Sequence, residues 1–369
     1  MKTLSLGLIV CAWMTAQAGA QSVHLTWRGK PMSAELLAEA PESVRQSVAA
    51  WSQFTAATGG RMVLSEDCHT LLVLSAAHLR KQEHKELREV DSRVRMLDQT
   101  SAIGEVALPR WTAAAVPAVL VGVRSAHYRA LLDHVAALDP RLADWAASAA
   151  RHVAGFVLTE PLVGAWIEDP QGVEEWQPDN EMVHRAMQLQ VRGRVGDLPA
   201  WLTLGMAWHA EDMVCRSIYC FPYRDGFVSV GTHSDWGLWL ANEFKKGKRK
   251  SKGQPERITL EEFAMWQPGV STGEFDATKA FLAFGFARFL LSEHGPRLAP
   301  VLVSIREEQE RGRVTWISAN EWTTNPGYQL PVADQLRLLS GLDPDLLDAA
   351  TEFLRKKLAN RRVVRTARR

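Results

Sequence analysis

Apolar positions are spaced differently in the two halves of the chain. In the first half they form short continuous or alternating runs, which predict β-strands. In the second half they recur at three- and four-residue intervals, which predict amphipathic helices. The expected strands are residues 22–27, 61–64 and 70–76, then 117–123, and a strand pair or one long bent strand at 155–168. The expected helices are residues 33–57 with a break at Pro41, 125–154 with a break at 139–140, 259–266, 278–294, 298–312, 332–339 and 343–358.

We therefore expect an α+β fold, with a small mixed sheet in the first half and a predominantly helical second half. Two charged segments are predicted to lie on its surface. Residues 81–98 interleave acids and bases at helical spacing, which is typical of a solvated helix with surface ion pairs. Residues 242–254 form a basic, Gly-containing stretch, and we interpret it, like the basic tail at 359–369, as exposed.

The first twenty residues have the pattern of a secretory signal. Lys2 is followed by an apolar run from Leu4 to Trp13 and by small residues up to Ala20. That run is shorter than the ~20 residues needed to span a bilayer. We expect export with cleavage near Ala20, a periplasmic or extracellular location, and no transmembrane segment in the mature chain. The expected domain organisation is a signal peptide at 1–20, a strand and helical segment at 21–60, one domain at 61–358 and the tail.

Composition excludes few classes of protein. The chain is 46% hydrophobic and carries a formal net charge of +1, so a nucleic-acid partner is not expected. Its 14 Trp residues, against 4 Tyr, are interpreted as core. An exported chain permits disulfides, and Cys215 with Cys220 could close a short loop, which leaves Cys68 without a partner.

The stretch from Asp179 to Asp212 carries the candidate chemistry. It contains two helix-like segments joined by a Gly-containing turn at 191–197. Asn180, Glu181 and His184 lie on the first segment, and Leu204 lies on the second within the sequence WLTLGMA. Four-residue spacing places positions 180 and 184 on one face of a helix, which is the arrangement that two zinc-binding histidines need.

In these residues the chain resembles the peptidase MA-like families, the gluzincin zinc metallopeptidases, with their H-E-x-x-H and W-L-x-E-G-x-A segments. The resemblance extends over roughly 61–358 and implies a zincin-like domain, with the motif helix packed under a small sheet. It would assign metal binding to positions 180, 184 and 204 and the role of general base to Glu181. Asn180 and Leu204 depart from this pattern. An amide is a poor zinc ligand and Leu offers no lone pair, so His184 alone cannot hold catalytic zinc.

Three nearby side chains are possible substitutes for the missing ligands. Glu211 lies about two helical turns beyond Leu204, which we expect to be too far along the helix without movement of the helix. His209 is expected to be rotated away, and Asp212 is adjacent to Glu211. A site rebuilt from His184, His209 and an acid stays open. So does a plain interpretation, in which Asp179 or Asn180 caps a helix and His184 is an ordinary, partly buried histidine.

Three functions follow from these residues. The first is an exported, catalytically inactive relative of the gluzincins, a pseudoenzyme kept as a binding or scaffolding protein for an unknown protein or peptide, with no cofactor expected. The second is an active zinc metallopeptidase with a non-standard ligand set, in which Glu181 is the general base. The third is a structural envelope protein without a ligand.

Overall fold

The computed structural model describes much of the chain from residue 23 to residue 356. The described residues are 23–27, 30–31, 62–65, 70–75, 92–93, 95–97, 99–100, 102–104, 106–108, 118–123, 125–138, 140–158, 163–168, 176–219, 236–244, 257–266, 276–319, 321–325 and 327–356. The expected signal peptide, the helices at 33–57, the basic loop at 245–252 and the tail lie outside them.

The first half of the described chain forms a mixed sheet. Its order is β2-β1-β4-β5-β7-β6, with β3 also paired to β4. β4 and β5 pair in parallel, as do β5 and β7, whereas the remaining pairs are antiparallel. The predicted strands are confirmed, and the segment at 155–168 is a strand pair. The strands are β1 (Val23–Trp27), β2 (Lys30–Pro31), β3 (Met62–Ser65), β4 (Thr70–Ser75), β5 (Ala118–Val123), β6 (Gly155–Leu158) and β7 (Val163–Ile167).

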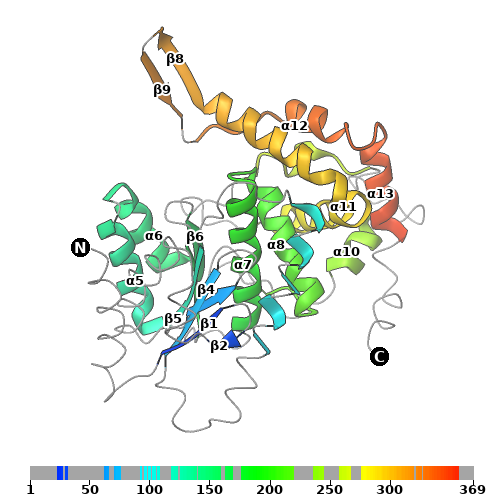
Figure 1. The fold of residues 1–369 in the computed structure, drawn as a ribbon. Coiled ribbons are helices and arrows are strands. Elements are labelled where there is room, and N and C mark those ends of the chain that lie inside the picture. The colour runs from blue at the N-terminus through cyan, green and yellow to red at the C-terminus, as the bar shows by residue number, and fades with distance from the viewer. Residues whose placement is uncertain are drawn as a thin grey trace.

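Helices lie on both sides of this sheet in Figure 1. The predicted break at 139–140 is confirmed, because η2 (Pro140–Leu142) separates α5 (Ser125–Leu138) from α6 (Ala143–His152). This pair packs on β6 through Phe156, whose ring lies 5.3 Å from that of Trp145 and 6.2 Å from that of Tyr128. On the other side, α7 (Pro178–Arg194) contacts the sheet above Gly164, where a Cβ would meet Leu189 at 3.0 Å.

A short connection joins α7 to α8 (Ala200–Val214) and makes the two helices neighbours. The turn is shorter than the predicted 191–197, because α7 continues to Arg194. Gly196 lies just after the end of α7 and has a φ of 108°, a left-handed conformation that favours glycine. Its amide donates to the carbonyl of Val191 in the last turn of α7.

The second half of the described chain is mainly helical, as predicted, so the described residues form an α+β fold. Its longest element is α11 (Ala277–Arg313), which starts at the N-cap Asp276 and continues through Pro296 and Pro300. We predict two helices here, and the structure joins them into one. The segment predicted as a helix at 259–266 contains only the short η3 (Leu260–Glu262). The remaining helices are α10 (Trp236–Glu243), α12 (Val332–Leu339) and α13 (Leu346–Lys356). None of the described helices combines the length and apolarity needed to cross a bilayer.

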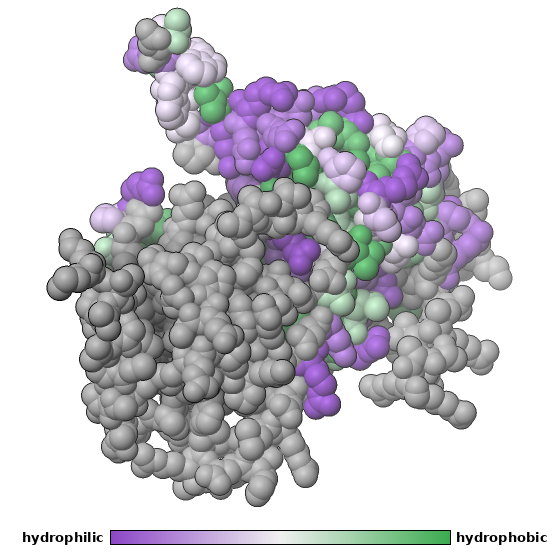
Figure 2. Space-filling model, viewed as in Figure 1, coloured by the Kyte–Doolittle hydropathy of each residue, from purple (hydrophilic) through white to green (hydrophobic). Residues whose placement is uncertain are grey.

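A β-hairpin that the periodicity analysis missed follows α11. β8 (Val314–Ser318) and β9 (Glu321–Thr324) form a separate antiparallel pair, which extends away from the sheet and the helices in Figure 1. Figure 2 shows the same projection standing clear of the rest of the visible surface. The signal was present in the alternating β-branched and aromatic residues of VTWIS and EWTT.

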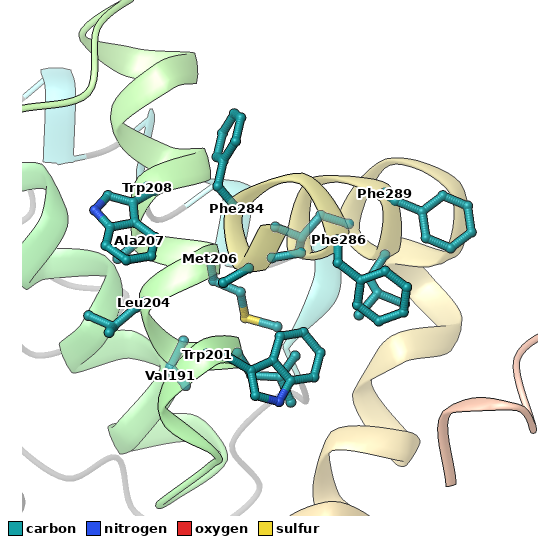
Figure 3. Packing of buried hydrophobic residues seen from close by; sticks show 14 of the residues in the cluster. Val191, Trp201, Leu204, Met206, Ala207, Trp208, Phe284, Phe286 and Phe289 are labelled. Atoms are coloured by element: carbon teal, nitrogen blue, oxygen red, sulfur yellow. The ribbon is translucent and has the colours of Figure 1, made fainter. Parts of the chain in front are cut away.

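The main hydrophobic core lies between α7, α8 and α11 and is drawn in part in Figure 3. Trp201 of α8 packs on Phe263 and Phe286, with ring centroids 5.2 and 5.5 Å away, and donates its indole N–H to Gln335. Trp208 packs on Trp236 and stacks on Trp266. Four of the tryptophans are fully buried, as the composition suggested, and these are Trp166, Trp201, Trp208 and Trp236.

Gly205 allows α8 and α11 to approach closely. A Cβ at this position would lie 2.5 Å from the carbonyl oxygen of Ala283, a backbone atom that cannot move without shifting α11. We expect Gly205→Val to lower the free energy of unfolding by about 3 kcal/mol or more, because overpacking forces the two helices apart. Denaturant unfolding followed by circular dichroism measures this effect.

Gly327→Ala is the matched control, since this exposed turn glycine has only an ordinary 3.5 Å contact at the Cβ position. Equal stability of Gly205→Val and wild type would contradict the close packing of these helices.

Candidate functional site

The first turns of α7 carry Asn180, Glu181 and His184, the residues that resemble part of a zinc motif in the sequence. Pro178 occupies the first helical position, and acidic residues follow in the first turn, where the helix dipole favours them. Asn180, Glu181 and His184 are all buried, with at most 3% of each exposed. They are therefore part of the protein interior and do not line a surface.

Glu211 of α8 gathers the motif residues into one network. His184 Nδ1 lies 2.6 Å from its Oε1, and Asn180 Nδ2 donates to its Oε2 at 3.0 Å. The backbone N–H of Tyr219 donates to the same Oε2 at 2.9 Å. Asn180 Nδ2 also donates to the carbonyl of Ser217 at 2.7 Å. One fully buried carboxylate thus ties the start of α7 to the segment that follows α8.

The protonation state of this network follows from burial. Desolvation, together with the neighbouring Arg185 charge, holds the pKa of His184 well below its usual value, so the imidazole is neutral. A neutral imidazole can donate from Nδ1 to Glu211, whose carboxylate oxygens then accept from three donors. The pKa of the Cys215 thiol is raised by burial and then by the negative charges of Glu211 and Asp179.

Glu181, the candidate general base, is engaged elsewhere. Its Oε2 accepts from Arg185 at 2.8 Å, one helical turn away, and Arg185 also donates to Gln188. The guanidinium lies over β6, where a Cβ on Gly155 would meet Arg185 Nε at 2.6 Å. One carboxylate oxygen of Glu181 is therefore held by a guanidinium on the same helix.

The structure corrects the expectation for Glu211. Its spacing from Leu204 predicts that it lies too far along α8 to replace a ligand missing at that position without movement of the helix. His184 lies about as many residues before the loop between α7 and α8 as Glu211 lies after it. Because the two helices are antiparallel, this places the two side chains opposite each other. Glu211 is thus the side chain that meets Asn180 and His184 directly.

The other candidate residues do not join this network through any described contact. Leu204 is one of the buried core residues drawn in Figure 3. Asp212 forms an ion pair with Arg288 of α11. His209 is buried with no hydrogen-bond partner for Nδ1, and burial, with the nearby charge of Arg288, lowers its pKa to about 3.

A second buried charge cluster corrects the interpretation of the charge-rich run at 81–98. Arg93 lies in it and is only 3% exposed. It donates to Asp179 Oδ1 at 2.8 Å and to both carboxylate oxygens of Glu168 at 3.1 Å. These contacts connect the start of α7 to the end of β7. At least Arg93 in this run is therefore buried and links α7 to β7, because an arginine can be buried where carboxylates neutralise it.

Cys215 carries a free thiol, with Sγ 3.8 Å from the carbonyl oxygen of Asp179. Cys220, its predicted disulfide partner, lies outside the described residues, and with Cys215 free the predicted disulfide is not formed in the structure.

The donors present do not fit a zinc ion. Two ligand atoms bound about 2.1 Å from a tetrahedral ion lie about 3.4 Å apart. The 2.6 Å separation of His184 Nδ1 and Glu211 Oε1 is instead that of a short hydrogen bond. Among the described residues, no group of three His, Cys, Asp or Glu side chains is arranged to hold a metal.

Comparisons of the chain with protein-family models, curated proteins and solved structures found no match. The class of site therefore follows from the described residues alone. It is a buried hydrogen-bond network, centred on one carboxylate, between two helices of an α+β fold.

Proposed function

We propose that the chain is a non-catalytic, zincin-like protein that acts through binding or scaffolding, with its metal site replaced by the hydrogen-bonded network of Glu211. The observation that carries this proposal is the engagement of every motif side chain in the interior. Asn180 and His184 bind Glu211, and Glu181 binds Arg185. Hydrolysis needs a nucleophile or an activated water that reaches a substrate, and groups that are buried and hydrogen-bonded inside the protein offer neither.

The geometry around His184 supports a zincin ancestry. In zinc sites a ligating histidine commonly donates its second ring N–H to a carboxylate, which fixes the ring orientation. Glu211 makes this contact with Nδ1 of His184. The packing of α7 against the mixed sheet also agrees with the arrangement that the resemblance implies. On this proposal, the supporting carboxylate of an ancestral metal site is kept while two ligand positions are lost.

An active enzyme with a rearranged ligand set is the second candidate. Its support is the proximity of His184 and Glu211, which brings two potential ligands together. The spacing of their atoms, the amide of Asn180 and the separate ion pair of Asp212 count against it.

Restoring the two lost ligands tests the proposal. We expect Asn180→His combined with Leu204→Glu to bind about one zinc ion per chain, because a His, His, Glu set with Nδ1 of His184 already oriented suits tetrahedral zinc. Zinc is measured by elemental analysis after dialysis of the purified, folded protein. Adding His184→Ala to the double variant is the matched control and should abolish the gain.

Two results would count against the proposal. A folded double variant that binds no zinc would argue against zincin ancestry. Stoichiometric zinc in the wild-type chain that disappears on His184→Ala would favour the enzyme with a rearranged ligand set.

A further inference from the structure

The base of the β8–β9 hairpin is held firmly on the body of the protein. The amide of Asn325, just after β9, donates to the carbonyl of Arg313 at the end of α11. Tyr328 packs over Gly312, where a Cβ would lie 2.1 Å from its ring. Arg313 also forms an ion pair with Asp197 in the loop between α7 and α8. The direction in which the hairpin projects is therefore set by the fold.

The projecting part of the hairpin exposes large apolar side chains. Trp316 is 65% exposed, Ile317 61% and Trp322 57%. Trp316 and Trp322 lie directly opposite each other in the strand register, so they share one face. An isolated two-stranded hairpin is marginally stable in water, and further strands with an apolar face are what stabilise it.

β8 has one feature that hinders strand pairing, a register irregularity between Trp316 and Ser318. Its sequence, VTWIS, contains no charged residue and no proline. Edge strands are usually protected by such residues, and an unprotected apolar edge is a template for another strand. Among the described residues, β8 pairs only with β9. Its second row of backbone donors and acceptors is not paired with any described strand.

We propose that β8 pairs antiparallel with β8 of a second copy of this chain, with position 316 on the two-fold axis. Trp316 would then face Trp316 of the second copy, and Thr315 would face Ile317. The two hairpins form a four-stranded sheet, and the tryptophans of both copies lie on one face.

Charge argues for this occupant. No like charges meet at the β8–β8 interface, because the only charged side chain in the two strands, Glu321, is on the outer strand β9. The absence of Lys and Arg from these strands disfavours a polyanion or an acidic lipid surface. Ser318 and Glu321 flank the turn, and this polar tip is unsuited to insertion into a bilayer.

The area available predicts a weak dimer. The three exposed side chains offer on the order of 400 Å² per copy, judged from the size of tryptophan side chains. A stable interface buries about 800 Å² per partner. We therefore expect a reversible dimer that forms in a concentration-dependent manner, in the high micromolar range.

Sedimentation equilibrium of the full chain over a concentration series tests the proposal. Wild type should shift from monomer to dimer, whereas Trp316→Glu and Trp316→Lys should each remain monomeric, because like charges meet at the axis. Mixing the two variants should restore the dimer, since opposite charges then face each other. Leu238→Glu is the matched control, an exposed apolar position on α10, and should dimerise like wild type.

Three outcomes would overturn the proposal. The first is a wild-type chain that stays monomeric throughout the series, a result that needs no variant to fold. The second is a Trp316→Glu variant that dimerises as wild type does. The third is a monomeric wild type that binds phosphatidylcholine vesicles through Trp316, which would assign the hairpin to a lipid surface.

Discussion

Replacing Glu211 with alanine is expected to lower the free energy of unfolding by about 3–5 kcal/mol. The carboxylate is fully buried and accepts from His184, Asn180 and the amide of Tyr219. Its removal leaves three donors without a partner in the interior and opens a cavity between α7 and α8. Denaturant unfolding at pH 8, followed by tryptophan fluorescence and circular dichroism, measures the loss.

Two further variants calibrate this result. Glu211→Gln keeps the shape and one acceptor oxygen, so its cost should lie between those of wild type and Glu211→Ala. Asp133→Asn is the control, because Asp133 forms an exposed ion pair with Arg129 and should change stability by less than about 1 kcal/mol. A Glu211→Ala chain as stable as this control would refute the central role of the carboxylate.

Acid is expected to destabilise the protein steeply between about pH 6.5 and pH 4. The pKa of His209 is lowered to about 3 and that of His184 lies well below its usual value, in both cases mainly because of burial. Below about pH 6.5 the unfolded chain binds protons at both histidines and the folded chain does not. Each histidine therefore removes about 1.4 kcal/mol of stability per pH unit as the pH falls, and neither costs stability above about pH 7.

Substitution of His209 isolates its share of this pH dependence. His209→Leu cannot titrate, so its free energy of unfolding should fall less steeply below pH 6.5, by about 1.4 kcal/mol per pH unit. At pH 8 the variant serves as its own reference, because His209 is neutral in both states there. Identical slopes for wild type and variant between pH 6 and pH 4 would mean that His209 is protonated in the folded protein.

The two histidines and Glu211 give the non-catalytic proposal a physical basis. A catalytic acid or base needs a pKa near the working pH and contact with substrate. The burial of His184 and His209 holds both rings neutral, and Glu181 is paired with Arg185. Of the motif side chains, Asn180 and His184 instead link α7 to α8 through Glu211.

Local periodicity was enough to predict most of the described elements. Residues 332–339 are helical in both the prediction and the structure, and the strands at 118–123 and 163–167 follow apolar runs that the sequence displays directly. These elements could be found because their apolar spacing repeats within a few residues. The hairpin at 314–324 was missed because two short strands joined by a brief turn repeat too few times.

The pairing of side chains across elements could not be read from spacing along one helix. Asn180, His184 and Leu204 stood out in the sequence because of their spacing. The partner of Asn180 and His184 is Glu211, and this contact depends on where the loop between α7 and α8 reverses the chain. In the same way, Arg93 can be buried because Glu168 and Asp179 lie next to it in the fold. Such contacts join residues far apart in the chain. A buried charge needs a neutralising partner nearby in space, and that partner need not be near in sequence. The sequence thus singled out the residues of the possible zinc motif, and only the fold revealed the carboxylate network that joins Asn180 and His184 to Glu211.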